Sequence, residues 1–189
     1  MTNILTTIDT ETIRGAQAGR PEQVTTLYEH YHASIFRYLY YRVGDRQIAE
    51  DLTSEVFLRM IRNLSGYRLQ GSSAPFQAWL FQIAHNLVTD HFRRSSIHPQ
   101  VSLAENIAST DTGLDAGVER HLNHEHLRVA LSELNEDQRD VVVLRFVVGM
   151  TIIEVARSLN KSEDAVKGLQ RRGLSALKES LSKSEASYV

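Results

Sequence analysis

Apolar residues recur every three or four positions along most of this 189-residue chain, which is the spacing of one face of an α-helix. Prolines, which interrupt helices and sheets, occur only at Pro21, Pro75 and Pro99. No stretch keeps the alternation of apolar and polar residues that marks a half-buried strand. The sequence therefore predicts an all-α protein.

Three long helices are predicted in the first half of the chain. Residues 22–42 form the first, and Gly44 and Asp45 are suited to end this helix and to cap the next one. The second helix runs to about Asn63. After a loop at residues 65–74, Pro75 opens a third helix that reaches Arg94. The stripes expected to be buried are Val24, Leu27, Tyr31, Ile35, Tyr38 and Leu39 in the first helix; Ile48, Leu52, Val56, Met60 and Leu64 in the second; and Phe76, Leu80, Ile83, Leu87 and His91 in the third.

The character of the sequence changes after Arg94. Residues 95–118 contain Pro99, two glycines and many small polar residues with little periodicity, which predicts a flexible linker. Helical patterning resumes near Val118 and continues to about Lys183. We therefore expect two small helical domains. The full division is an N-terminal segment (1–21), the first domain (22–94), the linker (95–118), the second domain (119–183) and a C-terminal tail (184–189).

The second domain carries a helix-turn-helix pattern. Thr151 and Glu154 have the spacing of a capping box at the start of a short helix. Asn160 and Lys161 provide a tight turn, and Ser162 can cap a longer helix. The apolar stripes are Ile152, Val155, Ala156 and Leu159 in the short helix and Val166, Leu169, Gly173 and Leu177 in the long one. In this motif the second helix enters the major groove of DNA, and its early residues contact base edges.

The polar side chains of the long helix have the chemistry needed to read base edges. Lysine and arginine can donate to guanine, glutamine can pair with adenine, and a carboxylate can accept from cytosine. Glu163 and Asp164 also suit the positive end of the helix as caps. The alternative to a DNA-binding motif is an ordinary helical hairpin whose polar face is merely solvated. Gly168 leaves room for DNA or for a tightly packed helix. The residues expected at the DNA are Ser162, Glu163, Asp164, Lys167, Gln170, Arg171 and Arg172.

Two segments together resemble a known family. AEDLTSEVFLRMIRNL, followed by a loop and FQAWLFQIAHNLVTDHFRR, resembles region two of bacterial RNA polymerase sigma factors of the extracytoplasmic-function (ECF) group. LSELNEDQRDVVVLRFVVGMTIIEVARSL with SEDAVKGLQRRGLSAL resembles their region four. The resemblance covers roughly residues 22–94 and 122–182. It departs from the family pattern at Leu134-Asn135, where the family usually has Leu-Pro, and in the Gly168-Leu169 and Arg171-Arg172-Gly173 runs.

The resemblance implies a transcription initiation factor that binds core RNA polymerase and promoter DNA. Region two, a helical bundle, would dock on the polymerase and melt the minus-ten element, and region four would read the minus-thirty-five element. The loop Ser65–Ala74 matches the family's specificity loop, which accommodates a flipped base. A cognate anti-sigma factor is an expected partner. The polymerase-docking residues would be Asp51, Leu52, Ser54, Glu55, Leu58 and Arg59.

The same resemblance places the third helix next to the melted strand. An aromatic ring for stacking, amides for base edges and guanidinium groups for phosphates suit an unpaired strand. The alternative is that Trp79 belongs partly to the core and that Asn86 and Asp90 tie neighbouring helices together. The residues expected at the minus-ten strand are Trp79, Gln82, Asn86, Asp90, Arg93 and Arg94.

Other chemistry is weakly supported. The chain has no cysteine, which excludes disulfides and thiolate metal sites. His121, His124 and Glu125 could share a helix face, with His126 beside them, but no HExxH pattern accompanies them, so we expect no metal, no cofactor and no enzymatic activity. Neither a signal sequence nor about 18 consecutive apolar residues occur, which predicts a cytoplasmic protein without membrane insertion.

Charge and composition leave two further functions open. The net charge of −2 gives no sign of a nucleic-acid partner, but residues 157–178 carry six basic side chains against two acidic ones. One alternative is a stand-alone helix-turn-helix regulator that binds a palindromic duplex without polymerase. The other is a sigma-like decoy that titrates an inhibitor, whose activity would not depend on Lys167 and Arg171.

Overall fold

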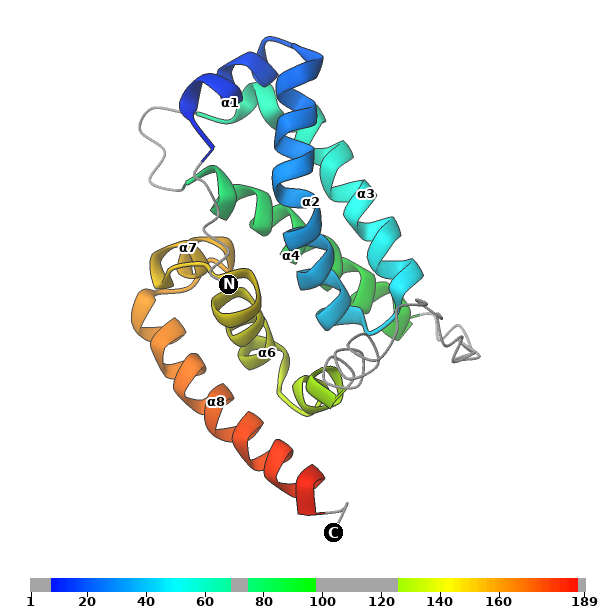
Figure 1. The fold of residues 1–189 in the computed structure, drawn as a ribbon, viewed down its shortest axis with the longest axis vertical. Coiled ribbons are helices and arrows are strands. Elements are labelled where there is room, and N and C mark those ends of the chain that lie inside the picture. The colour runs from blue at the N-terminus through cyan, green and yellow to red at the C-terminus, as the bar shows by residue number, and fades with distance from the viewer. Residues whose placement is uncertain (1–7, 69–74, 98–125, 187–189) are drawn as a thin grey trace, which may run out of the picture.

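The computed structural model describes residues 8–68, 75–97 and 126–186, and every regular element in these ranges is helical. The first half contains α1 (Thr10–Gln17), α2 (Pro21–Val43), α3 (Arg46–Asn63), the 3₁₀ turn η1 (Leu64–Gly66) and α4 (Phe76–Ile97). The second half begins with helical residues 126–132 and continues with α6 (Glu136–Val142), the π-helical turn η2 (Val143–Val148), α7 (Ile152–Ser158) and α8 (Glu163–Ala186). The prediction of an all-α protein is confirmed (Figure 1).

Local sequence signals set the helix boundaries. The αL residue Gly44 ends α2, and the Asp45 carboxylate accepts a hydrogen bond from the Ile48 amide at 2.8 Å to cap α3. Asn135, at the departure from the family's Leu-Pro, caps α6 by accepting from the Gln138 amide at 2.9 Å. An amide cap therefore starts this helix where the family places a proline.

Helix α1 lies inside the predicted N-terminal segment, residues 1–21. The Asp9 carboxylate caps it, and the hydrogen bond from the Thr12 amide lowers the pKa of Asp9. Ile13 and Ala16 are buried against the first domain. At Gly15 a Cβ atom would lie 2.7 Å from Gln23 Cγ, so the missing side chain lets α1 approach α2 closely. The short helix therefore extends the first domain.

The predicted stripes of α2 and α3 do form the core of the first domain. Tyr31, Ile35, Tyr38 and Leu39 are buried in α2, and Val56, Met60 and the following Leu64 are buried at α3 and η1. Ile48 and Leu52 are only half-buried. The buried face of α3 is instead completed by Ala49, Thr53 and Phe57.

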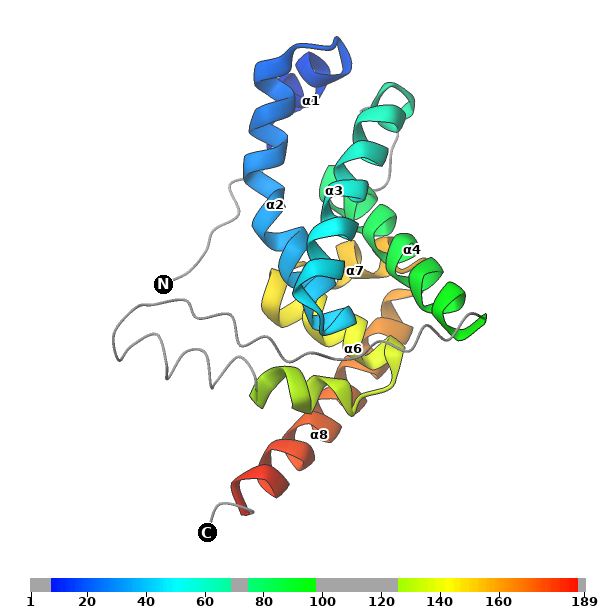
Figure 2. The same cartoon turned by 90° about the vertical axis from the view of Figure 1, so that its right-hand side faces the viewer.

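Helix α4 has a second buried stripe in addition to the predicted one. Phe76, Leu80 and Leu87 are buried as expected, but Ala78, Phe81 and Val88 are buried as well. The cause is the position of α4, which contacts α2 and α3 of its own domain and α7 of the second domain. Figures 1 and 2 both show α7 beside α4. The two predicted domains therefore share one continuous core.

Candidate functional site

Helix α3 presents the predicted polymerase-docking residues along its outer side. Asp51, Ser54 and Leu58 are exposed, whereas Leu52, Glu55 and Arg59 are half-buried. Arg59 Nε donates to Glu55 Oε1 at 2.8 Å, one turn away on the same helix. Leu52 packs partly against the core, so it lies between the surface and the interior.

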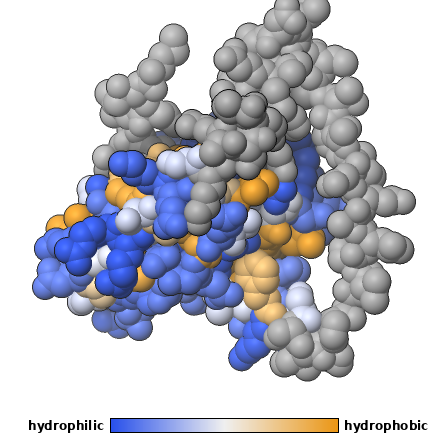
Figure 3. All heavy atoms as spheres, turned by 90° about the horizontal axis from the view of Figure 1, so that it is seen from below, coloured by the Kyte–Doolittle hydropathy of each residue, from blue (hydrophilic) through white to orange (hydrophobic). Residues whose placement is uncertain are grey.

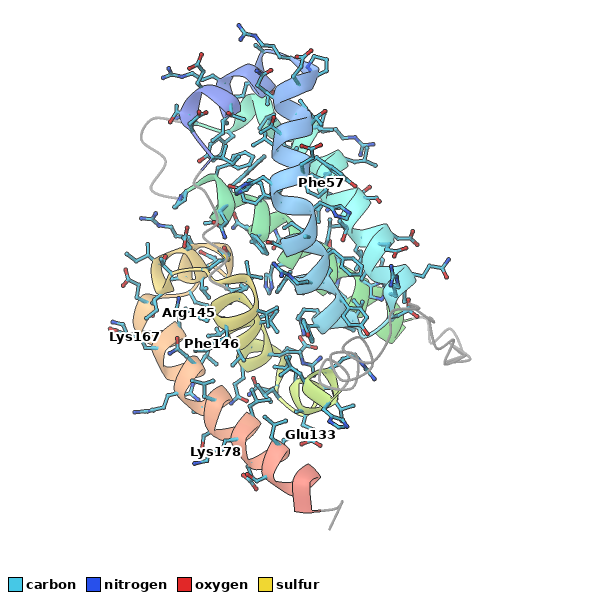
Figure 4. The ribbon with its side chains drawn as sticks, in the orientation of Figure 1. Phe57, Glu133, Arg145, Phe146, Lys167 and Lys178 are labelled. Atoms are coloured by element: carbon cyan, nitrogen blue, oxygen red, sulfur yellow. The ribbon has the colours of Figure 1, made fainter. Side chains whose placement is uncertain are left out.

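Two large apolar side chains of α3 are exposed among these polar residues. Leu58 retains 48% of its accessible surface and Ile61 retains 51%. The sequence prediction included Leu58 and missed Ile61, although its spacing of three residues from Leu58 is a helical neighbour relationship that could have identified it. Neighbouring apolar side chains in a polar surround are typical of a protein-binding surface. In Figure 4, Phe57 lies between α2 and α3.

Trp79 belongs to an aromatic cluster at the start of α4. Its ring centroid lies 5.1 Å from that of Tyr67 and 5.4 Å from that of Phe76, and Tyr31 lies 5.8 Å from Phe76. Trp79 is half-buried. Gln17 of α1 donates to the Tyr67 carbonyl at 2.7 Å, which anchors the chain just before residues 69–74. Those residues, and with them most of the predicted loop Ser65–Ala74, lie outside the described residues.

The remaining predicted residues of α4 form a polar side of the helix. Asn86, Arg93 and Arg94 are exposed, whereas Gln82 and Asp90 are half-buried. Arg93 Nη2 and Asp90 Oδ1 form an ion pair at 3.0 Å within the helix. Asp90 therefore contacts an arginine of its own helix, whereas the alternative interpretation had assigned it to a contact between helices.

The helix-turn-helix is built by α7, a turn and α8. The Thr151 hydroxyl accepts from the Glu154 amide at 3.2 Å, and the Glu154 carboxylate accepts from the Thr151 amide at 2.7 Å, which completes the predicted capping box. Asn160 adopts a positive φ of 51° in the turn. The Ser162 hydroxyl accepts from the Ala165 amide at 3.2 Å and so caps α8.

The outer side of α8 carries most of the predicted DNA-facing residues. Glu163, Asp164, Lys167, Arg171 and Arg172 are exposed. Lys167 Nζ donates to Asp164 Oδ1 at 3.0 Å, and this hydrogen bond raises the pKa of Lys167. Lys167 projects from the outer edge of α8 (Figure 4). The exposed residues at the start of α8 therefore combine two carboxylates with three cations.

Gln170 does not share this outer position. It is half-buried, and its Oε1 accepts a hydrogen bond from Arg145 Nε of η2 at 3.1 Å. Arg145 also donates to the Met150 carbonyl. The helical position alone placed Gln170 outward, and the structure adds a contact from the Arg145 side chain of η2.

The glycines of α8 serve different purposes. At Gly173 a Cβ atom would lie 2.8 Å from Val142 Cγ2 of α6, so this glycine permits close helix packing. At Gly168 the nearest neighbour of a Cβ atom would be Arg172 Nη1 at 3.3 Å, the end of a flexible side chain. Close helix packing, the alternative considered for Gly168, therefore applies to Gly173.

A buried polar cluster that the sequence did not predict joins the two domains. Tyr38 and Arg42 come from α2, His85 from α4 and Asp140 from α6. The Tyr38 hydroxyl donates to Asp140 Oδ1 at 2.8 Å, and Arg42 Nε lies 2.7 Å from the same oxygen. Burial and the neighbouring Asp140 carboxylate raise the pKa of Tyr38 well above its usual value. The phenol is therefore protonated and available as a donor. Helical spacing could reveal that Asp140 faces inward, but not which residues of the distant α2 would meet it.

Metal binding and membrane insertion were also considered for the described residues. No group of three or more histidine, cysteine, aspartate or glutamate side chains in the described ranges could hold a metal ion. The candidate ligands His121, His124 and Glu125 lie outside those ranges, and His126 is exposed. Among the helices that the structure describes, none is long and apolar enough to cross a membrane. Viewed from below, the described surface is mostly hydrophilic with smaller apolar patches (Figure 3).

Comparison with known proteins matches both halves of the chain to family models. The model described as "Sigma-70 region 2" matches residues 27–97. The model described as "Sigma-70, region 4" matches residues 130–179. The two matches fall on the two predicted helical domains, in the predicted order.

Curated relatives resemble the chain over most of its length. It is 39% identical over 169 residues to the ECF RNA polymerase sigma factor BldN of Streptomyces coelicolor, covering 88% of this chain. The chain spans 63% of the length of that relative. It is 34% identical over 163 residues to the ECF RNA polymerase sigma factor SigX of Bacillus subtilis, covering 83% of this chain and 82% of SigX.

Solved structures share the fold. CnrH in complex with the cytosolic domain of CnrY matches with a TM-score of 0.71 at 21% identity, covering 92% of this chain and 96% of CnrH. The sigma factor RpoE in complex with the anti-sigma factor NepR, from Bartonella quintana, matches with a TM-score of 0.66 at 19% identity. That match covers 84% of this chain and 96% of RpoE.

Proposed function

This chain belongs to the ECF group of RNA polymerase sigma factors, and we propose that it binds core RNA polymerase and directs it to specific promoters. The observation that carries this proposal is the presence of both sigma regions in one chain, each with its own exposed surface. A sigma factor acts by binding, and the proposal gives this chain no catalytic step of its own. The proposed place of action is the bacterial cytoplasm, where polymerase and promoter DNA meet.

The first domain, proposed as residues 22–94, would dock on the polymerase through α3. Leu58 and Ile61 supply exposed apolar area, and Asp51, Glu55 and Arg59 supply charges around them. Apolar anchors within a polar rim are the usual composition of a specific protein interface. Leu52 and Ser54 would line the same helix.

Helix α4 of this domain would contact the melted minus-ten strand. Arg93 and Arg94 are exposed and suited to phosphates, and Asn86 is exposed and suited to a base edge. Gln82 and Asp90, both half-buried, would complete the surface. Trp79 would contribute one edge of its ring, since the rest packs on Tyr67 and Phe76.

The second domain, proposed as residues 119–183, would read the minus-thirty-five element through α8. Lys167, Arg171 and Arg172 would supply donors to guanine or phosphate. Ser162 caps the helix, and Glu163 and Asp164 lie in its first turn. All three would approach the DNA, because a recognition helix enters the groove with its N-terminal end. Gln170, held by Arg145, would support this surface from its flank.

The proposed partners also include a cognate anti-sigma factor. The structure of RpoE, which has the same fold, contains the anti-sigma factor NepR. A binding partner of this kind would have to engage one or both of the domains described above.

Run-off transcription tests the proposed function. Core polymerase with this protein is expected to give a specific transcript from the DNA upstream of its own gene, and neither component alone should do so. The double substitution Lys167→Ala with Arg171→Ala should abolish that transcript while core binding in a pull-down persists. Tight binding to a palindromic duplex without polymerase, together with no core binding, would instead identify a stand-alone regulator. An activity that the double substitution leaves unchanged would indicate a decoy that titrates an inhibitor.

A further inference from the structure

An acidic side chain of the second domain is buried in a polar pocket of the first domain. Asp140 of α6 lies 2.7 Å from Arg42 Nε of α2, and the two side chains retain only 2% and 1% of their accessible surface. The Tyr38 hydroxyl donates to the same carboxylate oxygen at 2.8 Å. His85 Nδ1 lies 3.4 Å from the other oxygen. Three side chains of the first domain thus surround one carboxylate of the second.

The surroundings of the pocket extend this interface. The Arg42 guanidinium lies 5.3 Å from the Phe92 ring centroid, and its Nη2 lies 3.9 Å from the exposed Glu136 carboxylate of α6. The Ser158 hydroxyl of α7 donates to the Ala78 carbonyl of α4 at 3.1 Å. The domains therefore meet through two polar contacts in addition to a shared apolar core.

This arrangement is incompatible with simultaneous contact to both promoter elements. Elements centred about 10 and about 35 base pairs from the start site are separated by about 25 base pairs, or about 85 Å of duplex at 3.4 Å per base pair. In the structure α7 contacts both α4 and α8, and the 22 residues of α4 extend only about 33 Å at 1.5 Å per residue, so the DNA-facing residues of α4 and of the start of α8 lie far closer together than about 85 Å. Any chain of 28 residues, the number between α4 and residue 126, has a maximum reach of about 90 Å.

We propose that the free chain is held in a closed, autoinhibited conformation by Asp140 bound in the Tyr38–Arg42–His85 pocket. Engagement of polymerase and promoter then requires that Asp140 leave the pocket and the two domains separate. The autoinhibitory role rests on the proposed sigma-factor function, whereas the closed conformation itself does not.

The charges make the contact a switch between two states. In the open chain, Arg42 and Asp140 are both solvated, so removing one of them costs the open chain little. In the closed chain, removing Asp140 leaves the Arg42 cation buried without its counter-charge, which is strongly unfavourable. Asp140→Asn should therefore shift the population about 100-fold toward the open state. Replacing both residues by apolar ones, Arg42→Met with Asp140→Leu, removes both buried charges and should keep the chain closed.

The distance between the domains can be measured directly, because the chain contains no cysteine. Glu29→Cys on α2 and Ser175→Cys on α8 place spin labels at exposed positions, one on each domain. Double electron–electron resonance on the full-length protein, without polymerase or DNA, should give one short and narrow distance distribution. With Asp140→Asn the distribution should become long and broad, and with the double apolar variant it should remain short.

Asp137→Asn is the matched control. Asp137 lies on the same helix but pairs with Lys161 of its own domain at 3.0 Å, so its substitution should leave the distance unchanged. The milder Tyr38→Phe, which removes only the hydroxyl, should move the distribution in the same direction as Asp140→Asn. Circular dichroism verifies that each variant is helical. A long, broad distribution in the unmodified chain would overturn the proposal, as would a short one that persists in both Asp140→Asn and Tyr38→Phe.

The consequence for activity is a separate measurement. Asp140→Asn should lower the apparent Kd for core polymerase, because less of the chain is held in a state that cannot bind. An open distance distribution with no gain in core affinity would refute the autoinhibitory role and leave the closed contact standing. If the unmodified protein directs no transcription with any core polymerase, the proposed function fails while the distance result remains interpretable.

Discussion

Arg145 of the π-helical turn η2 donates a hydrogen bond from its Nε to Gln170 Oε1 of α8 across 3.1 Å. Arg145 also donates to the carbonyl of Met150, just before α7 begins. One side chain therefore links η2 to α8 and to the residue that precedes the N-cap of α7. Packing against α6 and α7 sets the orientation of α8, and the Arg145–Gln170 hydrogen bond adds to it on the flank next to η2.

Substitution of Arg145 by alanine is expected to loosen α8. The change removes a hydrogen bond to a side chain and one to a carbonyl, and it should lower the free energy of unfolding by about 1–3 kcal/mol. Urea denaturation followed by circular dichroism provides the measurement. Arg171→Ala is the matched control, because this exposed arginine should change stability by no more than about 0.5 kcal/mol. Equal destabilisation by the two substitutions would argue that the hydrogen bonds of Arg145 to Gln170 and Met150 do not stabilise the domain.

Leu58→Glu is expected to separate polymerase binding from stability. Leu58 is 48% exposed, so the charge should change the free energy of unfolding by no more than about 1 kcal/mol. The loss of an apolar anchor at an interface should weaken core binding by tenfold or more, which corresponds to about 1.4 kcal/mol. Core affinity can be measured by fluorescence anisotropy. Glu50→Ala, at an exposed site on the same helix, should bind core normally. Unchanged affinity in Leu58→Glu would exclude this part of α3 from the interface.

Arg93→Ala with Arg94→Ala is expected to impair promoter melting. Both arginines are exposed on α4, and the loss of two phosphate contacts should weaken open-complex formation while core binding stays intact. A 2-aminopurine probe in the minus-ten element reports melting by its fluorescence. The effect should shrink as salt increases, because released counterions drive such contacts. Arg46→Ala, exposed at the start of α3, serves as the control, and equal melting by both variants would contradict the assignment.

The paired substitutions Gly173→Ala and Gly66→Ala are expected to differ in stability. A Cβ atom at Gly173 would lie 2.8 Å from Val142 Cγ2, and the resulting overpacking should cost about 1–3 kcal/mol. At Gly66 nothing lies within 4 Å, and φ is not positive, so alanine should be neutral or stabilise by up to about 1 kcal/mol. Thermal unfolding of the two variants compares them directly. A Gly173→Ala variant as stable as the parent would show that α6 and α8 can separate without cost.

Stability is expected to fall in alkaline solution. Burial raises the pKa of both Tyr31 and Tyr38 above the usual value of a phenol. Because the folded-state pKa is higher than the unfolded one, this stabilisation is fully present below about pH 10 and is lost as the pH rises beyond it. Urea denaturation between about pH 9 and about pH 11 should show the decline. Tyr31→Phe and Tyr38→Phe should each make the free energy of unfolding fall less steeply with pH, whereas Tyr28→Phe at an exposed site should not.

The sequence predicted the local features of this fold well. Asp45, Thr151 and Ser162 were identified as caps from residue type and spacing, and all three accept the expected amide hydrogen bonds. Such contacts span three residues, so the local sequence contains both partners. The buried stripe of α2 was equally accessible, because helical periodicity alone identifies it.

Features that depend on distant residues were not predictable in the same way. The burial of Ala78 and Phe81 results from the contacts of α4 with helices that are distant in sequence, α2 for Phe81 and α7 for Ala78. The hydrogen bond between Gln170 and Arg145 of η2 was likewise not predictable, because the two residues lie 25 positions apart. Periodicity identifies the apolar side of a helix, but it does not indicate how many other helices will pack against that helix. The pairing of Arg42 with Asp140 across 98 positions is the extreme case.

The pairing of Arg42 with Asp140 also limits how these domains can be recombined. A chimaera that joins this first domain to the second domain of a relative would place whatever residue stands at position 140 against the Arg42 guanidinium. An aliphatic residue there would leave a buried cation, and a basic residue would add repulsion. The two positions should therefore change together over evolutionary time. In a synthetic sigma factor assembled from exchanged domains, this one pair would decide whether the free chain is closed or open.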